Sequence, residues 1–231
     1  MEAIVLAGGK GARLGELSRE TPKPMLPVGD KPFLEYILDY LYQEGVTHIV
    51  LSVGYLARKI IGYFGDNYKG VPITYSIETE PMGTGGAIRV SMEFAKEDEV
   101  IVLNGDTFFQ INLNSVLDKH RHKGALLTMV LRYVDNCSRY GVALLEGDKV
   151  VGFKEKSAGG EALVNGGVYI VNRHAALELM PVKSHSFEID FLPSMLSKDK
   201  VYAVINDEYF IDIGIPDDYQ RARNEMIPDN L

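Results

Sequence analysis

The amino-acid sequence predicts an α/β fold, with one domain in which helices flank a mixed, mainly parallel central sheet. The length of 231 residues suits one compact domain. In the first half, short apolar segments rich in valine and isoleucine alternate with helical patterns, which is typical of parallel strands covered on both faces. In the second half, strand patterns follow one another directly, so the sheet is expected to be mixed.

The first half contains four short buried-strand patterns, each bounded by glycine, proline or charge: 2–7, 47–53, 72–77 and 99–104. Helices are predicted between them over 33–44, 55–64 and 86–96. For the clearest helix, 33–44, Asp30 is expected to act as the N-cap and Pro32 to lie in the first turn, where a missing N–H costs nothing.

The second half predicts consecutive strands over 125–134, 140–146, 149–155 and 163–171. The stretch Glu146-Gly147-Asp148-Lys149 is typical of a hairpin turn. Helices at 173–179 and 187–197, strands at 201–205 and 209–213, and a polar helix from Pro216 complete the expected order. No hexapeptide repeat follows the domain.

Composition excludes several classes of protein. The net charge of −8 argues against a nucleic-acid partner, and no apolar run reaches the length of a membrane span. Cys137 is the only cysteine, which excludes an internal disulfide. The acidic start at Glu2 does not resemble a secretory signal, so a cytoplasmic protein is expected. Its many tyrosines and phenylalanines are compatible with a homodimer.

A glycine-rich loop directly follows the first predicted strand and contains Gly8, Gly9 and Gly11. Glycines let the backbone approach a ligand and direct N–H groups inward, as a phosphate site requires. Arg13 and Lys23 add positive charge to an otherwise acidic protein, which suits a compact anion. At this point a tight surface turn with a solvated arginine and lysine explains the same residues equally well.

Two known phosphate-binding patterns do not fit this loop. A dinucleotide fingerprint opens a helix, whereas 21–27 contains three prolines, so an extended, cation-bearing loop is expected instead. The second strand ends in Gly54-Tyr55 and lacks the acid that binds a ribose, which argues against a dehydrogenase. The loop also lacks the Gly-Lys-Ser/Thr of a Walker A motif.

Two aspartates stand where acids are unusual. Asp106 follows a buried strand at the same expected sheet edge as the glycine loop, and Asp212 interrupts a late apolar strand. Carboxylates are ligands that Mg²⁺ prefers, although a turn aspartate and an edge-strand aspartate are the plain alternatives. The histidines show no metal-ligand spacing, and His120 and His122 are expected in solvent at a polar helix end.

The combined motifs resemble those of the sugar-1-phosphate nucleotidyltransferases, which have a Rossmann-like fold. They are LAGGKGARL at 6–14, PKPMLP at 22–27, GDKPFL at 29–34, EPMGTGGA at 80–87, NGD at 104–106 and FIDIG at 210–214. Within the family, FLEYILDYL, LSVGY and YSIETEPMGTGGAI most resemble the D-glycero-α-D-manno-heptose 1-phosphate guanylyltransferases. Ala12 departs from the pattern, since relatives usually have threonine there.

The resemblance implies one nucleotidyltransferase domain over 1–231, in which approximately 1–110 bind the nucleotide, 111–215 bind the sugar phosphate and 216–231 form a C-terminal helix. It implies transfer of a nucleoside monophosphate from a triphosphate, with GTP favoured, to a sugar 1-phosphate. Pyrophosphate would leave, and the product would be a nucleotide sugar such as GDP-heptose, used for surface polysaccharide. The attacking phosphate oxygen is already anionic, so no general base is needed.

The resemblance also implies roles for single residues. The catalytic cations would be Arg13 and Lys23, and Mg²⁺ would be held by Asp106 and Asp212. The nucleotide would contact Leu6, Ala7, Gly8, Gly9, Gly11, Glu80, Pro81, Gly83, Thr84 and Asn104. The sugar phosphate would contact Gly141, Glu155, Lys156, Asn165 and Tyr169.

Two rival functions stay open at this stage. One is the same reaction with other substrates, such as mannose 1-phosphate with GTP, or glucose 1-phosphate with UTP or dTTP. The other is a nucleotide-sensing module without activity, although such proteins typically lose the phosphate-loop cations or the metal-binding acids, and this sequence retains both.

Overall fold

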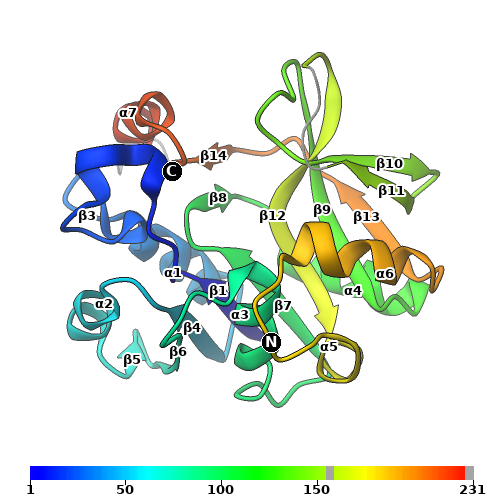
Figure 1. Ribbon diagram of the computed structural model, residues 1–231, viewed down its shortest axis with the longest axis horizontal. Helices are drawn as coiled ribbons and strands as arrows, with labels where there is room; N and C mark the ends of the chain where they lie inside the picture. Colours follow the sequence, from blue (N-terminus) through cyan, green and yellow to red (C-terminus); the bar gives the residue numbers. More distant parts are fainter. Residues whose placement is uncertain (155–158, 227–231) are drawn as a thin grey trace.

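The computed structural model describes residues 1–154 and 159–226, and its centre is one twisted sheet (Figure 1). Within the described residues this sheet has the strand order β10-β11-β13-β9-β12-β7-β1-β4-β6-β5. Its strands are β1 Glu2–Leu6, β4 His48–Val53, β5 Asn67–Tyr68, β6 Val71–Ile77, β7 Glu99–Asn104, β9 Leu127–Val134, β10 Val142–Glu146, β11 Lys149–Lys154, β12 Ala162–Asn172 and β13 Val201–Ile205.

Parallel pairing is concentrated in the first half of the chain. Strand β1 pairs in parallel with β4 and β7, and β4 pairs in parallel with β6. Strand β12 then pairs antiparallel with β7 and β9, and β10 and β11 form the expected hairpin, with Glu146 opposite Lys149. The mixed α/β sheet predicted from the sequence is therefore confirmed.

Two small ladders lie outside the main sheet. Strands β2 (Pro27–Val28) and β3 (Lys31–Pro32) form one, and β8 (Thr107–Phe109) and β14 (Phe210–Asp212) form the other. Both pairs are antiparallel. The second ladder joins a segment directly after β7 to one near the end of the chain, and it shapes the site described below.

Helices cover both faces of the sheet. The α-helices are α1 Phe33–Gln43, α2 Ala57–Phe64, α3 Gly83–Ser91, α4 Leu113–Lys123, α5 Arg173–Leu179, α6 Leu192–Leu196 and α7 Pro216–Glu225, and η3 Phe187–Phe191 is a π-helix. Buried side chains of α1, α2, α4 and α7 join the core on one face, and those of α3, α5, η3 and α6 join the core on the other. Successive side chains of β1 point to opposite faces of the sheet, so Ala3 and Val5 join the first core and Ile4 joins the second.

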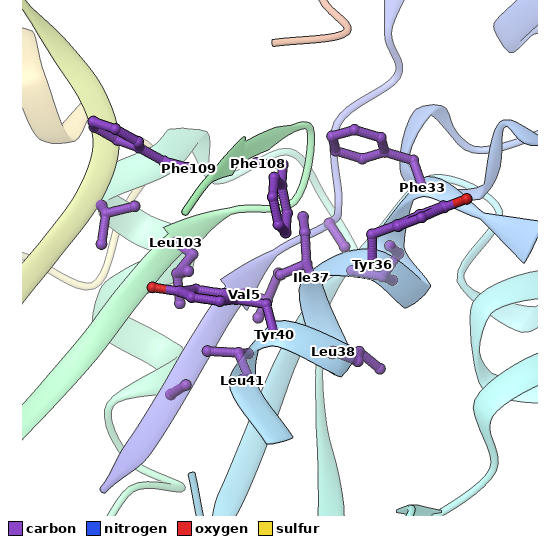
Figure 2. Packing of buried hydrophobic residues seen from close by; sticks show 14 of the residues in the cluster. Val5, Phe33, Tyr36, Ile37, Leu38, Tyr40, Leu41, Leu103, Phe108 and Phe109 are labelled. Atoms are coloured by element: carbon purple, nitrogen blue, oxygen red, sulfur yellow. The ribbon is translucent and has the colours of Figure 1, made fainter. Parts of the chain in front are cut away.

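Helix α1 anchors the first core (Figure 2). Its buried face packs with Val5 and Leu103, and the Tyr40 ring meets Phe108 edge-on at a centroid distance of 5.7 Å. The Tyr40 hydroxyl donates to the Ile111 carbonyl at 2.8 Å, which satisfies its buried polar group. Full burial of a side chain such as Ile37 contributes about 1.5–3 kcal/mol, so this face carries much of the domain's stability.

The start of α1 differs from the prediction. Pro32 occupies the N-cap position and no side chain caps the helix, whereas Asp30 is exposed. The β2–β3 ladder explains the difference, because it holds 27–32 in an extended turn that leads directly into the helix. The predicted capping role of Asp30 is therefore wrong.

The end of the described chain returns to the beginning. Helix α7, red in Figure 1, contacts β2 near the start of the chain. The Tyr219 hydroxyl donates to the Pro27 carbonyl at 2.7 Å, and the Tyr36 hydroxyl donates to the Met226 carbonyl at 3.1 Å. These bonds fix the segment that carries β14 against the N-terminal loop.

The loop after β1 is more ordered than expected. It contains two short 3-10 helices, η1 (Ala12–Ser18) and η2 (Lys23–Met25), and η1 is kinked at Gly15. A 3-10 turn needs only i→i+3 bonds, such as Met25 N–H to the Pro22 carbonyl at 2.7 Å. The prolines therefore prevent a long helix, as predicted, but not a short turn, and the expectation of an extended loop is wrong.

Within the described ranges, no helix combines the length and the apolar character that a membrane crossing requires.

The prediction that His120 is solvated is wrong. Its side chain is 2% exposed, and Nδ1 lies 2.9 Å from the Thr128 hydroxyl on β9. The helical period places it on the face of α4 that meets the sheet, beside Val116 and Leu117, although its neighbours in the sequence are polar. Burial lowers the pKa of His120 from 6.5 to about 4, so the folded protein holds a neutral imidazole at neutral pH.

This burial predicts an acid-sensitive fold. Because the unfolded chain binds the proton more tightly, the stabilisation is complete above the ordinary histidine pKa and is lost as the pH falls toward about 4. Between pH 7 and pH 5, the loss through His120 should be about 2 kcal/mol. Urea unfolding at both pH values should show this loss in the wild type and in the exposed control His122→Gln, but not in His120→Gln. An equal loss in all three proteins would contradict the assignment.

Candidate active site

A cavity of about 810 Å³ opens at the carboxyl ends of β1, β4, β6 and β7. Its lining comes from the turns that follow these strands and from the first turn of α3. Parallel strands bring their carboxyl ends to one edge of the sheet, so four loops that are distant in sequence meet there. A volume of this size suits a ligand as large as a nucleotide.

The residues predicted to bind a nucleotide all lie in this lining: Leu6, Ala7, Gly8, Gly9, Gly11, Glu80, Pro81, Gly83, Thr84 and Asn104. Arg13, Lys23 and Asp106 line the same cavity. The structure therefore brings these side chains and backbone groups together, and their individual roles remain predictions.

Two glycines of the first loop occupy positions that a side chain would disturb. A Cβ on Gly8 would lie 2.5 Å from Glu78 Oε1. Gly11 has a φ of +63°, in the left-handed region, and a Cβ there would lie 3.1 Å from the Lys23 Cβ. The loop can therefore approach both β6 and Lys23 closely.

Lys23 lies between the two aspartates. Its side chain is buried, and Nζ lies 2.5 Å from Asp106 Oδ2 and 3.7 Å from Asp212 Oδ1. The pairing of β14 with β8 produces this arrangement, because Asp212 stands opposite Thr107 and its neighbour Ile213 donates an N–H to the Asp106 carbonyl at 3.0 Å. Residues 23, 106 and 212 thus form one charged cluster.

The cluster contains two carboxylates and one ammonium group. Burial raises the pKa of Asp212 above its ordinary value, the nearby carboxylate of Asp106 raises it further, and Lys23 opposes both. The surplus negative charge and oxygen donors fit a divalent cation. Among the described residues, no group of three or more histidine, cysteine, aspartate or glutamate side chains could hold a metal. A cation bound by Asp106 and Asp212 would therefore need further oxygen ligands from a bound anion or water.

Arg13 approaches the cluster from the glycine loop. It is exposed, lines the cavity and lies close enough to Asp212 to lower the pKa of that carboxyl. Together, Lys23 and Arg13 place one buried and one accessible positive charge on the same cavity, an arrangement that suits a multiply charged anion.

Three of the predicted sugar-phosphate residues, Gly141, Asn165 and Tyr169, lie outside the cavity lining. Asn165 N–H donates to the Gly141 carbonyl at 2.9 Å, so these two lie together. Tyr169 is 1% exposed, and its hydroxyl accepts from Asn165 Nδ2 at 2.5 Å and donates to Glu188 Oε1 at 3.0 Å. A direct ligand contact does not fit this burial, so Tyr169 would act through Asn165. Glu155 and Lys156 lie outside the described residues.

Sequence reasoning missed Glu78. It lines the cavity, and its Oε2 accepts the Met82 N–H at 3.0 Å. The rule that singled out Asp106, an acid directly after a buried parallel strand, applies equally to Glu78 after β6.

The chain is similar to known proteins over nearly its whole length. The model of the nucleotidyl transferase family matches residues 2–228. The chain is 45% identical, over 98% of both chains, to the D-glycero-alpha-D-manno-heptose 1-phosphate guanylyltransferase of Aneurinibacillus thermoaerophilus. It is 43% identical to the Campylobacter jejuni protein of the same name, over 95% of this chain and 97% of that one. The crystal structure of HddC from Yersinia pseudotuberculosis complexed with GMP-PN superposes with a TM-score of 0.87 and 35% identity, and the match covers 98% of this chain and 99% of that chain.

The charged cluster predicts how the fold responds to loss of Lys23. In Lys23→Met, two carboxylates face each other without an ammonium group. Unfolding free energy should fall by about 2 kcal/mol, less than for a fully buried pair because both acids are partly exposed. Urea denaturation at pH 8 measures this loss, and adding Asp106→Asn to the variant should restore most of the stability. Unchanged stability in Lys23→Met would show that the ion pair contributes little.

Proposed function

The chain belongs to the nucleotidyl transferase family, and from this premise we propose that it transfers GMP from GTP to D-glycero-α-D-manno-heptose 1-phosphate. Pyrophosphate and GDP-heptose are the products. The observation that carries the proposal is the cluster of Lys23, Asp106 and Asp212, of which Lys23 and Asp106 line the same cavity as the glycine loop. Identity of 45% and 43% to two heptose 1-phosphate guanylyltransferases supports the choice of substrates.

In the proposed reaction, an oxygen of the sugar 1-phosphate attacks the α-phosphorus of GTP in line. A new phosphoanhydride bond forms as the bond between the α-phosphorus and its bridging oxygen to the β-phosphorus breaks. That oxygen leaves with pyrophosphate. The attacking oxygen is already anionic, so no side chain has to remove a proton. The task of the protein is to align two anions that repel each other.

Positive charge in the cavity opposes this repulsion. Arg13 and Lys23 would stabilise charge on the triphosphate and the leaving pyrophosphate. Asp106 and Asp212 would hold Mg²⁺, which, when bound, neutralises and aligns phosphate oxygens. The oxygen ligands that these two acids cannot supply would come from GTP and water, which agrees with the small number of acids in the described part of the site.

The two halves of the chain would bind different substrates. Approximately 1–110 would hold the nucleotide and 111–215 the sugar phosphate. As the resemblance to the family implies, Lys156 would bind the phosphate group of the sugar phosphate and Glu155 a sugar hydroxyl. Gly141 and Asn165 would contact the sugar ring. A cytoplasmic location, where nucleoside triphosphates are supplied, is part of the proposal.

The acids in the cavity favour guanine. Glu78 and Glu80 lie in the loop after β6, whereas Lys10 and Arg13 lie in the loop after β1. Guanine presents an N1–H and a 2-amino group side by side, and a carboxylate accepts both. Adenine has an acceptor at N1, and uracil and thymine have a single N–H, so none of them matches a carboxylate as well. Guanine would therefore be recognised largely by acceptor groups of the protein.

The catalytic assignment predicts large kinetic effects. Arg13→Ala and Asp106→Ala should each lower kcat/KM by about 100- to 1000-fold, because each removes an electrostatic stabiliser of the transition state. Pyrophosphate release would be measured with GTP and heptose 1-phosphate, and circular dichroism would verify the fold. The exposed control Arg58→Ala on α2 should retain normal turnover. Near-normal turnover in Arg13→Ala or Asp106→Ala would refute the assigned roles.

A substrate panel tests the proposed function itself. The wild type would be assayed with GTP, ATP, UTP and dTTP, each with the 1-phosphates of heptose, mannose and glucose. GTP with heptose 1-phosphate should give the highest kcat/KM. A higher value with another pair would replace the substrates, and nucleotide binding without any pyrophosphate release would instead indicate a sensing module.

The role of Glu78 predicts a change in base selectivity. Glu78→Gln should lower kcat/KM for GTP by roughly 10-fold or more, since a hydrogen bond to a charged group is lost. ITP lacks the 2-amino group, so its kcat/KM should fall less, and the preference for GTP over ITP should shrink. The matched control Glu178→Gln, exposed on α5, should leave this preference unchanged. An unchanged preference in Glu78→Gln would exclude contact with the 2-amino group.

A further inference from the structure

The segment before η3 is hydrogen-bonded to the predicted nucleotide loop at 82–85. His185 N–H donates to the Met82 carbonyl at 3.0 Å, and Gly85 N–H donates to the His185 carbonyl at 3.0 Å. A Cβ on Gly83 would lie 2.5 Å from the His185 carbonyl oxygen, and one on Gly85 would lie 2.4 Å from the His185 ring. These glycines therefore allow a close backbone contact as well as an approach to a ligand.

The side chain of Thr84 extends this contact toward η3. Its hydroxyl accepts the Phe187 N–H at 2.9 Å and donates to Glu188 Oε2 at 3.1 Å. Thr84 also lines the large cavity. One residue of the predicted nucleotide site is therefore bonded through its hydroxyl to a carboxylate on a different element.

The second oxygen of Glu188 leads to the sugar side. Oε1 accepts from the Tyr169 hydroxyl at 3.0 Å, and the tyrosine oxygen in turn accepts from Asn165 Nδ2 at 2.5 Å. Tyr169 is held by burial and by an edge-on contact with Phe187 at a centroid distance of 5.0 Å. The bonds form a continuous chain from Thr84 through Glu188 and Tyr169 to Asn165.

The Glu188 carboxylate at the centre fixes which group donates in each of these hydrogen bonds. An ionised Glu188 only accepts, so Thr84 and Tyr169 must both donate to it. The Tyr169 oxygen is then free to accept, which turns the amide nitrogen of Asn165 toward it. Asn165 Oδ1 correspondingly accepts the Gly167 N–H at 3.0 Å. One N–H of the Asn165 amide is left for a ligand, with its orientation set by the chain.

We propose that Glu188 is a positioning residue that sets the amide of Asn165 for the sugar phosphate and couples it to the nucleotide loop at Thr84. The inference rests on the proposed function for the identity of the two ligands. Glu188 would touch neither substrate and would act through Tyr169 on one side and Thr84 on the other. The two halves of the site would then be joined by side-chain hydrogen bonds as well as by the sheet.

Kinetics of three single variants would test this series of hydrogen bonds. Glu188→Gln allows the central group to donate, Tyr169→Phe removes the connecting hydroxyl, and Thr84→Val removes the hydroxyl in the nucleotide loop. Each should raise KM for the sugar 1-phosphate by roughly 10-fold, the size expected for a hydrogen bond to a charged group. Glu188→Gln and Tyr169→Phe should change KM for GTP by less than roughly two-fold. A change of that size lies within the spread of the free energy that a single hydrogen bond contributes.

A double variant shows whether the hydrogen bonds from Thr84 to Asn165 act as one relay or whether each substitution has an independent structural effect. Because both substitutions break the same chain, Glu188→Gln with Tyr169→Phe should raise the sugar KM about as much as either alone. Thr84→Ser retains the hydroxyl, so it should raise the sugar KM less than Thr84→Val does. The exposed control Glu178→Gln on α5 should leave the sugar KM unchanged. Urea unfolding would verify that each variant is folded. An unchanged sugar KM in folded Glu188→Gln, or fully additive effects, would overturn the proposal.

A binding measurement keeps this test separate from the proposed function. Calorimetric Kd values for heptose 1-phosphate and mannose 1-phosphate need no turnover, and they should rise in the same three variants. If the wild type bound a sugar phosphate but released no pyrophosphate, the proposed reaction would fail while the relay could still be judged. Equal Kd values for the sugar 1-phosphates in the wild type and Glu188→Gln would refute the relay, whichever reaction the protein catalyses.

Discussion

The ammonium group of Lys23 holds the carboxylates of Asp106 and Asp212 together beside the cavity, and the arrangement of the charged cluster depends on this contact. Nζ reaches Asp106 at 2.5 Å and Asp212 at 3.7 Å while the lysine side chain is buried. One positive charge does not balance two negative ones. The cluster is therefore tolerable in the free protein and would be completed by a further cation. In the proposed function, the same residues would stabilise the fold and bind metal and phosphate.

Keeping this cluster assembled requires long-range structure. Asp106 is placed by the central parallel strand β7, but Asp212 is placed by the short β8–β14 ladder, which closes a loop of about a hundred residues. Helix α7 then bonds to the N-terminal loop through Tyr219 and Pro27. Helix α7 therefore holds the loop that carries Lys23 next to the strand that carries Asp212. The packing of this helix helps to fix the distances between the charged groups of the cluster.

Much of this could be predicted from the sequence wherever local rules apply. The strands, the flanking helices and the position of Asp106 follow from apolar period and from the shared edge of parallel strands. The contact of Asp212 with Lys23 could not be derived from residue patterns, because it depends on a pairing between segments far apart in the chain. His120 shows the opposite error: polar neighbours suggested solvent, while the helical period turned it inward. The link from Tyr169 to Glu188 joins a bulged strand to a π-helix, and no repeat or motif encodes it.

The two halves of the site follow different structural principles. On the proposed nucleotide side, backbone from four strand ends and a few charges face one open cavity. Recognition of phosphate and base would rest on groups that the parallel sheet places directly. On the proposed sugar side, Asn165 lies on β12 and Gly141 directly precedes β10. The Asn165 amide bonds to the buried Tyr169 hydroxyl, which bonds to Glu188, so the direction of each donor is set by its neighbour. In a cavity of the first kind, positive charge would bind the phosphates, and the carboxylates of Glu78 and Glu80 would select the base. A chain of oriented donors discriminates between hydroxyl arrangements that carry the same charge, and this is the property an enzyme needs to choose among sugar 1-phosphates.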